Sequence, residues 1–172
     1  GDFWPDAEHG IHVDHMNNVW IGGGGTGSSN ADSAVFKFAI DGTLLQTLGR
    51  KGVLPYDSSS RDTFGAPADI WVEEDDEEIW VADGYGNRRV IVLDYNTGRY
   101  KRHWGAYGND PVDAPTTYDP SAPPSDQFRP PVHCVLISDD EFVYICDRGN
   151  DRIQVFRKNG EFVFERFIAK NT

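Results

Sequence analysis

The sequence predicts an all-β protein, a β-propeller built from four-stranded antiparallel blades. A pattern of two short apolar strands around a Gly- and Asp-containing turn recurs three times in the 172 residues. Equivalent aromatic positions in the three units are Trp20, Trp80 and Tyr144, which are spaced by 60 and 64 residues. Without the loop insertions, each unit has roughly the 40–50 residues of a propeller blade. No run of about ten residues or more shows the 3.6-residue apolar period of a helix.

The whole chain, residues 1–172, is expected to form one domain, with the first blade at about residues 3–49. In this blade Ile11 and Val13 alternate with polar neighbours, which is typical of a strand. The other three strands are expected at residues 19–21, 34–38 and 44–49. A loop rich in Gly, Ser and Asn joins the second strand to the third, and Asp41-Gly42 forms a hairpin turn.

The second blade is expected at about residues 64–105 and the third at about 128–168. The runs that supply their strands are residues 64–72, 79–82, 90–93 and 100–105, and then 128–135, 142–146, 152–156 and 161–167. Two polar connectors, residues 50–63 and 106–127, separate the blades. The second connector is rich in Pro, Asp, Ser and Thr, and long loops of this kind are often functional or mobile.

Three blades are too few to close a propeller, which typically has four to eight. An unclosed wedge leaves apolar faces and strand edges bare. We therefore expect a partial propeller that missing blades or other chains complete.

The composition excludes several partners. The formal net charge is -12, which argues against nucleic acid and anionic membrane surfaces. No apolar run approaches the ~20 residues of a membrane span, and no signal-peptide pattern is seen. The chain starts at Gly1 rather than at a methionine, so an upstream segment is expected to be missing.

The two cysteines, Cys134 and Cys146, are too few to indicate a disulfide framework. Both fall on strand-like runs that should be neighbours in the third blade. Buried free thiols are the favoured interpretation, because free cysteines commonly lie in cores. A disulfide would need both side chains on the same face, and the sequence does not set that register.

The third blade resembles an NHL repeat, a fairly specific signature of a propeller. The residues that carry this resemblance are Pro131, Asp147, Arg148, Gly149, Asn150, the run 152–156 and Gly160. A narrower resemblance lies in the order of motifs along the chain. These motifs are residues 9–11, 48–50, 64–70, 83–90 and 103–105, then His133, Asp147-Arg148 and residues 152–154.

This order is similar to consecutive blades of peptidyl-α-hydroxyglycine α-amidating lyase, and it covers about half of a six-bladed member. The resemblance implies a zinc-dependent enzyme that cleaves a hydroxyglycine-extended peptide to the peptide amide and glyoxylate. It also implies an extracellular or periplasmic location and a structural calcium.

The resemblance assigns roles by position. It implies that His9 and His133 are two of three zinc ligands and that Tyr85 is the catalytic base. Arg148 matches an active-site arginine, and Ile11 matches the position whose backbone carbonyl helps to hold calcium. The third histidine, the main catalytic arginine and the calcium-binding aspartate belong to blades that this chain lacks.

Two further departures concern cysteines. Gly86 stands where the family has a disulfide-forming cysteine. The disulfide pair of the third blade is also expected to be missing, because Cys134 and Cys146 do not match both of its positions.

The residues themselves also favour a site. Strand starts in a propeller converge on one end of the central channel, so His9 and His133, at equivalent blade positions, can meet there. Catalytic zinc usually has three protein ligands and one open position. A tyrosine becomes a usable base only beside cations, and Arg148 could bind a carboxylate with both guanidinium nitrogens. The histidines and the tyrosine also have structural interpretations, as surface or hydrogen-bonded histidines and as a packed loop tyrosine. Arg148 has no counterpart in the second blade, where Gly84 holds its place, and this favours a functional role.

Other polar residues are expected to be structural. Asp83 and Asp147 recur at one repeat position and should cap turn amides between blades, while Arg89 and Arg152 should pair with neighbouring blades. The remaining histidines, His12, His15 and His103, are expected to be peripheral. The acidic run 73–78 is expected to be a solvated turn, and residues 22–27 lack the Lys and helix of a phosphate loop.

Three functions remain open at this point. The first is a metal-dependent lyase of the amidating type that acts on a small-molecule or peptide substrate. The second is a non-catalytic NHL propeller that binds a protein or a glycan. The third, weaker one is a lactonase-like hydrolase with carboxylate and Asn metal ligands.

Overall fold

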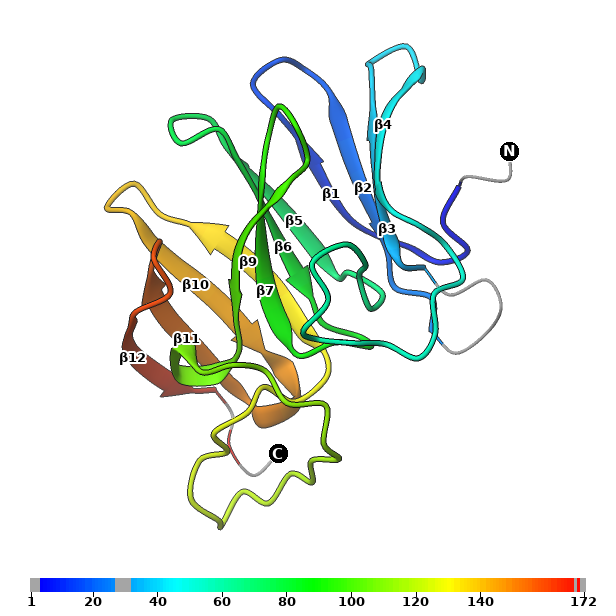
Figure 1. The fold of residues 1–172 in the computed structure, drawn as a ribbon. Coiled ribbons are helices and arrows are strands. Elements are labelled where there is room, and N and C mark those ends of the chain that lie inside the picture. Colours follow the sequence, from blue (N-terminus) through cyan, green and yellow to red (C-terminus); the bar gives the residue numbers. More distant parts are fainter. Residues whose placement is uncertain (1–3, 27–31, 169, 171–172) are drawn as a thin grey trace.

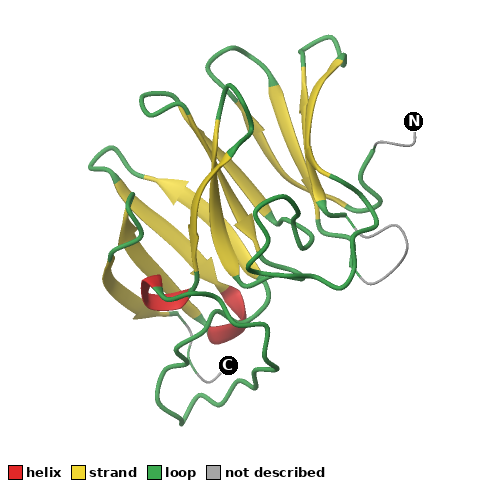
Figure 2. Cartoon of the chain, in the orientation of Figure 1, coloured by secondary structure: helices red, strands yellow, loops and turns green. Residues whose placement is uncertain are grey.

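The computed structural model describes residues 4–26, 32–168 and 170. They form three four-stranded antiparallel sheets that fan out side by side (Figure 1). In each sheet the strands are hydrogen-bonded in chain order. The helical segments of this part of the chain are two three-residue 3₁₀ turns (red in Figure 2). No described helix is long and apolar enough to cross a membrane. The predicted all-β fold class with four-stranded antiparallel blades is confirmed.

The strands fall on the runs from which the sequence predicted them. The first blade contains β1 (Glu8–Val13), β2 (Val19–Gly23), β3 (Ala34–Phe38) and β4 (Leu44–Gly49). The second contains β5 (Asp69–Glu73), β6 (Glu78–Asp83), β7 (Arg89–Asp94) and β8 (Tyr100–Trp104), followed by the turn η1 (Ala106–Gly108). The third contains β9 (Val132–Ile137), β10 (Phe142–Asp147), the turn η2 (Arg148–Asn150), β11 (Arg152–Arg157) and β12 (Phe162–Phe167).

The first strand of each blade lies where the blades meet. Strand β1 contacts β5, and β5 contacts β9, while β4, β8 and β12 form the opposite edges of their sheets. The order of strands from the inside outwards is therefore the same in all three blades.

Two apolar layers hold the blades together. Trp20 and Val35 of the first blade pack with Ile79 and Ile91 of the second. On the other side, the second blade packs against the third in a layer that includes Trp80, Trp104, Val135, Ile145 and Phe156. All six residues of β6 are buried, and a strand buried on both faces reads as a continuous apolar run. Full burial of each such aliphatic side chain contributes about 1.5–3 kcal/mol.

The outer faces of the first and third blades remain partly open. Ile11 and Val13 on β1 are 69% and 56% exposed, beside an apolar hollow of about 410 Å³ that Trp4 helps to line. On the third blade, Leu136 and Phe164 are 46% and 38% exposed. These are the faces on which the expected further blades or other chains would pack.

A buried Asp–Arg pair recurs at the turn after the second strand of the second and third blades. Asp83 accepts hydrogen bonds from the Gly65 amide, the Asn87 side chain and Arg89 Nε. Asp147 does the same with Arg129, Asn150 and Arg152. The prediction that both aspartates cap turn amides is confirmed, but the amides belong to the same blade and do not link neighbouring blades.

The prediction that the two arginines pair with neighbouring blades is wrong. Each arginine instead binds the aspartate of its own blade, at 2.8 Å for Arg89 and 2.7 Å for Arg152. The rest of the Arg89 guanidinium donates to carbonyl oxygens of the 50–63 connector, including Ser58. Arg152 similarly reaches the Gln127 carbonyl. The carbonyls of irregular connectors need donors, and a buried guanidinium supplies several at once.

Asp14 forms the polar part of the interface between the first two blades. Its carboxylate accepts hydrogen bonds from Trp20 Nε1 at 2.9 Å, Tyr95 Oη at 2.8 Å and the Asn18 amide at 2.8 Å. Burial alone would raise the pKa of Asp14, but these hydrogen bonds outweigh it and lower the pKa to about 2.

The favoured interpretation of Cys134 and Cys146 as buried free thiols is wrong. The two residues are directly opposite each other on β9 and β10 and form a disulfide, with Cα atoms 4.9 Å apart. The third blade thus has a disulfide of its own. The side chains of directly opposite residues lie on the same face of a sheet, which is the register that the sequence left open.

The acidic run 73–78 is only partly a solvated turn. Residues 74–77 are exposed, as predicted, but Glu78 is 4% exposed. Its carboxylate binds both terminal nitrogens of Arg102 at 2.7 Å. A bidentate pair of this kind stabilises a carboxylate where water cannot reach it.

Removing the Asp147 carboxylate should strongly destabilise the fold. In Asp147→Ala, the buried Arg152 guanidinium would lose its 2.7 Å partner and keep only Glu165, at 3.2 Å, as a counter-ion. The Arg129 amide and the Asn150 side chain would lose their acceptor as well, and we expect a loss of about 3–5 kcal/mol of unfolding free energy. The control is Glu161→Ala, which breaks the exposed Arg157–Glu161 pair and should cost about 0–1 kcal/mol. Urea denaturation measures both, and equal losses would contradict the structural role of Asp147.

The interface around Asp14 should give a pH-dependent contribution to stability. The folded-state pKa is lowered from 3.8 to about 2, so ionised Asp14 stabilises the fold above about pH 4 and loses this contribution as the pH falls towards 2. We expect the stability advantage of the wild type over Asp14→Asn to shrink by about 2 kcal/mol across this window. Urea denaturation of both proteins between pH 6 and 2 checks this, and a constant difference would contradict it.

Candidate functional site

Three aromatic rings from three blades meet at one end of the inner strands. His9 lies on β1, Tyr85 in the turn between β6 and β7, and His133 on β9. The ring centroids are 5.0 Å apart for His9 and His133, 5.2 Å for His9 and Tyr85, and 5.9 Å for Tyr85 and His133. The prediction that His9 and His133 lie close together is confirmed, and Tyr85 joins them. We call these three residues the ring cluster.

Each histidine lies at a β-bulge near the start of its inner strand. On β9, Cys134 is opposite Cys146 and Val132 is opposite Asp147, which leaves His133 as the extra residue. On β1, a similar register shift falls between His9 and Ile11. Strand β5, which has no histidine here, pairs with β6 without such a shift. Because a bulge turns the side chains of a strand end, the two bulges explain why both imidazoles reach the cluster.

The first bulge needs a glycine. A Cβ atom at Gly10 would lie 2.6 Å from both the Ala68 carbonyl oxygen and the Asp69 Cα. The backbone of β1 can therefore approach the second blade closely only because residue 10 has no side chain. This contact brings His9 beside Ala68.

Two hydrogen bonds fix the tautomer of His9. The Ala68 carbonyl oxygen lies 2.6 Å from Nδ1, and because a carbonyl can only accept, Nδ1 carries a proton. The Tyr85 hydroxyl lies 3.1 Å from Nε2. In the neutral imidazole Nε2 is therefore the acceptor, and Tyr85 donates to it. The lone pair of Nε2 is the atom that His9 can offer to a metal.

His133 provides a second imidazole nitrogen. Its Nε2 atom is buried and has no hydrogen-bond partner in the described part of the chain. Burial, helped by the charge of Arg148 and by His9, lowers the pKa of His133, so the ring is neutral at neutral pH. A buried nitrogen without a partner costs about 1–3 kcal/mol, which a metal ion or a substrate could recover.

Arg148 lies at the edge of the ring cluster. Its guanidinium carbon is 5.8 Å from the centre of the Tyr85 ring, and its side chain is exposed. His133, Cys146 and Arg148 line one cavity, whose volume is about 340 Å³. Asp151, Ile153 and Ile168 also line the cavity. A small carboxylate-containing molecule would therefore bind at the Arg148 end, beside the imidazole.

The equivalent position in the second blade cannot hold an arginine. Gly84 follows Asp83 just as Arg148 follows Asp147, and its carbonyl accepts a hydrogen bond from the Val132 amide at 3.3 Å. A Cβ atom on Gly84 would overlap the Val132 backbone. The third blade therefore provides an arginine where the second blade has no room for one.

The ring cluster fits a metal ion only in part. His9 and His133 could each offer one Nε2 atom, and imidazole nitrogens suit zinc. Among the described residues, no group of three or more His, Cys, Asp or Glu side chains is placed to hold a metal. Ile11 lies next to the first bulge with its side chain exposed. Zinc at the cluster and calcium at the Ile11 carbonyl stay predictions.

The other histidines contact rings outside the cluster. His12 packs on Trp71, His15 on Tyr95 and His103 on Tyr100. His12 lies half-buried between the first two blades, and burial lowers its pKa. It is therefore an interface residue.

Sequence reasoning missed two residues of the site. Ala68 orients His9 through its backbone carbonyl, and no side-chain pattern could reveal that. Gly24 packs under the rings, since a Cβ there would lie 3.2 Å from Tyr85 Cε2 and 3.4 Å from His9 Cδ2. The Gly-rich composition of residues 22–27 could have indicated close packing against the site, but it was compared only with the pattern of a phosphate-binding loop.

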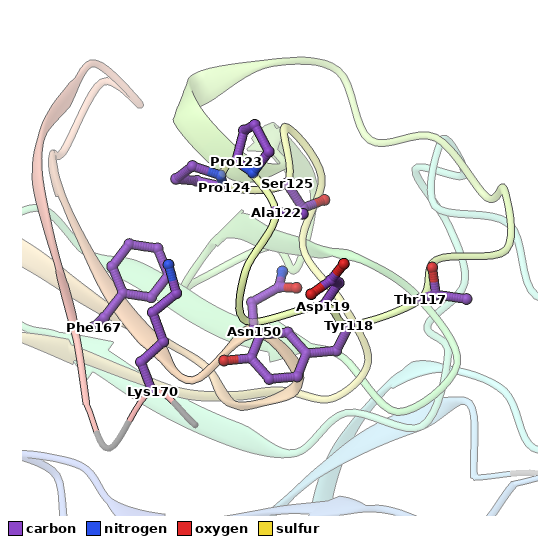
Figure 3. Close-up of a pocket in the computed structure, with 10 residues that line it drawn as sticks. All are labelled: Thr117, Tyr118, Asp119, Ala122, Pro123, Pro124, Ser125, Asn150, Phe167 and Lys170. Atoms are coloured by element: carbon purple, nitrogen blue, oxygen red, sulfur yellow. The ribbon is translucent and has the colours of Figure 1, made fainter. Parts of the chain in front are cut away.

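A separate pocket lies under the long 106–127 connector (Figure 3). Its volume is about 240 Å³, and it is lined by Tyr118, Pro123 and Pro124 of the connector and by Asn150, Phe167 and Lys170 of the third blade and the segment after it. None of the residues that line it belongs to the ring cluster. The connector is tied to the turn after β6, because Arg88 donates to Thr116 Oγ1 at 2.9 Å.

Comparison with known sequences identifies relatives of the chain, although no family model matches it. It is 33% identical over 157 residues to peptidyl-glycine alpha-amidating monooxygenase B of Xenopus laevis, a match that covers 90% of this chain and 16% of the relative. It is 30% identical over 161 residues to peptidylglycine alpha-amidating monooxygenase of Rattus norvegicus, covering 91% and 14%. A probable peptidyl-alpha-hydroxyglycine alpha-amidating lyase of Caenorhabditis elegans is 27% identical over 148 residues, covering 86% and 36%. The chain spans only a minor part of each relative's length.

Solved structures of β-propeller proteins share the fold. A streptogramin B lyase superposes with a TM-score of 0.59 at 17% identity, covering 98% of this chain and 43% of the lyase. The periplasmic gluconolactonase of Pseudomonas aeruginosa gives 0.55 at 13% identity, covering 95% and 40%. At such identities the likeness concerns the fold alone. Sequence and fold together show that this chain is a β-propeller homologue of the peptidylglycine alpha-amidating monooxygenases and of the amidating lyase.

Proposed function

We propose that these blades form part of the active site of a metal-dependent lyase of the amidating type. The substrate would be a peptide or N-acyl compound that ends in α-hydroxyglycine, and the products would be the amide and glyoxylate. The observation that supports this proposal is the meeting of His9, Tyr85 and His133 from three successive blades. The relatives in sequence are amidating enzymes by name.

His9 and His133 would hold zinc through their Nε2 atoms. Bound zinc would act as a Lewis acid on the substrate and lower the pKa of its hydroxyl group. The Ala68 carbonyl keeps the proton of His9 on Nδ1 and so leaves Nε2 available, a common arrangement for metal-binding histidines. The third protein ligand usual for catalytic zinc would come from outside these blades.

Metal binding and the Tyr85–His9 hydrogen bond compete for one lone pair. The Tyr85 hydroxyl donates to the same Nε2 atom that zinc would use. Loading the site would therefore release this hydroxyl from His9 and leave it free to face the substrate. Tyr85 would thus occupy the lone pair of His9 Nε2 when no metal is bound, and would face the substrate when the metal is bound.

Tyr85 Oη would move the proton in the reaction. As the base, it takes the proton of the substrate hydroxyl, the carbon–nitrogen bond breaks and the hydroxyl oxygen becomes the aldehyde oxygen of glyoxylate. The electron pair of the broken bond stays on the amide nitrogen, which receives the proton back from Tyr85. The guanidinium of Arg148 lies 5.8 Å from the centre of the Tyr85 ring, so the group that would move the proton and the group that would bind the substrate carboxylate lie close together.

Arg148 would bind the carboxylate of the hydroxyglycine. It lines the same cavity as His133, so a substrate held by its carboxylate at Arg148 would lie beside the imidazole. A guanidinium can hold a carboxylate with two parallel hydrogen bonds, which orients it as well as binding it.

The proposed activity is tested by glyoxylate release from an N-acyl-α-hydroxyglycine by the complete protein. We expect zinc-dependent release that chelators abolish and added zinc restores. Metal analysis of the purified protein separates the alternatives. Zinc supports the lyase, whereas calcium or magnesium without glyoxylate release would favour a lactonase-like hydrolase.

A non-catalytic binding propeller is the second candidate. The observation in its favour is the open apolar face of the first blade, where Ile11 and Val13 are largely exposed. Faces of this kind mark sites of protein assembly. A protein without metal and without glyoxylate release would support it.

The proposal also concerns the partners of the protein, its cellular location and a structural calcium. The net charge of -12 disfavours nucleic acid and anionic membranes as partners. The Cys134–Cys146 disulfide is in keeping with an extracellular or periplasmic location, since disulfides persist in oxidising compartments. A structural calcium at the Ile11 carbonyl would need ligands from further blades.

The competition at His9 predicts opposite effects of Tyr85→Phe on metal binding and on catalysis. Without the hydroxyl, zinc no longer displaces a hydrogen bond worth about 0.5–1.5 kcal/mol, so we expect roughly three- to tenfold tighter zinc binding. We expect kcat to fall by roughly 10²–10⁴-fold, because the proton-transfer group is lost. Zinc titration calorimetry and the glyoxylate assay measure the two effects.

The matched control is Tyr100→Phe, which removes a hydroxyl on the outer strand β8 and should change neither quantity. Undiminished activity of Tyr85→Phe would refute its role as base. Weaker zinc binding would show that Tyr85 is a ligand and not a competitor.

A further inference from the structure

The two histidines of the ring cluster are held in different ways. His9 is fixed by hydrogen bonds at both ring nitrogens, from Nδ1 to Ala68 and to Nε2 from Tyr85. His133 has no such bond at Nε2. The His133 ring is therefore kept in place by its contacts with the His9 and Tyr85 rings and by the backbone that carries it.

The backbone around His133 is also the irregular part of its strand. His133 is the extra residue of the bulge, between the pairs Val132–Asp147 and Cys134–Cys146. A bulge interrupts the ladder of backbone hydrogen bonds, so within its own sheet this end of β9 is less well held than a regular strand. The second blade holds the residue before His133, through the hydrogen bond from the Val132 amide to the Gly84 carbonyl. Leu136 on β9 is 46% exposed. The second blade therefore packs against only one face of β9.

The disulfide closes the last regular pair before this bulge. Cys134 directly follows His133, and Cys146 lies on β10 directly opposite Cys134. Cys146 also lies two residues before Arg148, and it lines the same cavity as His133 and Arg148. The covalent link thus connects the strand end that carries the imidazole with the strand end that carries the guanidinium.

The first blade lacks a link of this kind and has another support. The pair that follows its bulge is Ile11–Ile21, which is not covalent. There the second blade braces the bulge, because Gly10 fits against Ala68 and His9 donates to the Ala68 carbonyl. The covalent link therefore occurs at the bulge whose histidine lacks a hydrogen bond at Nε2.

We propose that Cys134 and Cys146 are positioning residues, whose disulfide holds His133 and Arg148 in the geometry of the site and makes that geometry sensitive to reduction. A dithiol supplies two electrons and two protons, the S–S bond breaks to give two thiols, and the dithiol becomes a disulfide. The bulge then loses its tether, and the His133 ring moves away from the cluster while His9 stays. Only the metal part of the test rests on the proposed lyase function.

Imidazole resonances of the full chain, recorded by ¹⁵N NMR without metal, test the proposal directly. After reduction with dithiothreitol we expect the His133 signals to shift or broaden, while His9 keeps the ¹⁵N pattern of its Nδ1-protonated tautomer, because its hydrogen bond to Ala68 is untouched. The Cys134→Ala/Cys146→Ala protein should show the displaced His133 signals from the start and no response to dithiothreitol. Unchanged His133 signals in protein whose two thiols have been titrated would overturn the proposal.

Amide hydrogen exchange separates positioning from general stability. Protection of the buried strands β6 and β7 should survive reduction, because their packing does not involve the disulfide. If that protection collapses together with the His133 signals, the disulfide acts on the whole fold and the positioning role is refuted.

Zinc binding gives an independent measurement. The double alanine variant has no thiols to bind the metal, and we expect its zinc affinity to be about tenfold lower than that of the oxidised wild type. Equal affinities would count against the proposal. If neither protein binds zinc, the proposed lyase function fails, but the NMR measurement still decides the role of the disulfide.

Discussion

The contacts of β5 with β1 on one side and with β9 on the other are the constraint on which the site depends. His9 and His133 belong to the first and third blades and meet only because the second blade fixes the angle and height of both. Two apolar layers hold this arrangement, and the middle blade is buried on both faces. A change that tilts the middle blade would therefore separate the two imidazoles even if it touched neither of them.

Backbone features, and not only side chains, position the residues of the ring cluster. The bulges turn the histidines inwards, the Ala68 carbonyl sets the tautomer of His9, and glycines at positions 10 and 24 allow close approach. A preorganised site needs such supports, since small errors in position are costly for catalysis. The site therefore consists of these backbone supports as well as the side chains that the resemblance implied.

The sequence was informative where the repeat made positions equivalent. The fold class followed from the spacing of Trp20, Trp80 and Tyr144, and the meeting of His9 and His133 followed from their shared place at a strand start. The disulfide was missed because a shift of one residue in register moves a side chain to the other face. The regular register that runs from the Ile137–Val143 pair to the Cys134–Cys146 pair is set by the hairpin turn between β9 and β10, and the sequence did not fix that turn. The partners of Arg89 were missed because carbonyls of an irregular connector have no signature in the sequence.

The contact between Gly84 and Val132 has a consequence for the geometry of the ring. If a fourth sheet docked on the third with the offset by which the third docks on the second, its main chain would come against the α-carbon of residue 148. At the contact between the second and third sheets this position has to be a glycine, Gly84. In the third sheet the same position carries the long side chain of Arg148. Any sheet that docked on the third would therefore have to be set further out or rotated, which would leave space beside the guanidinium.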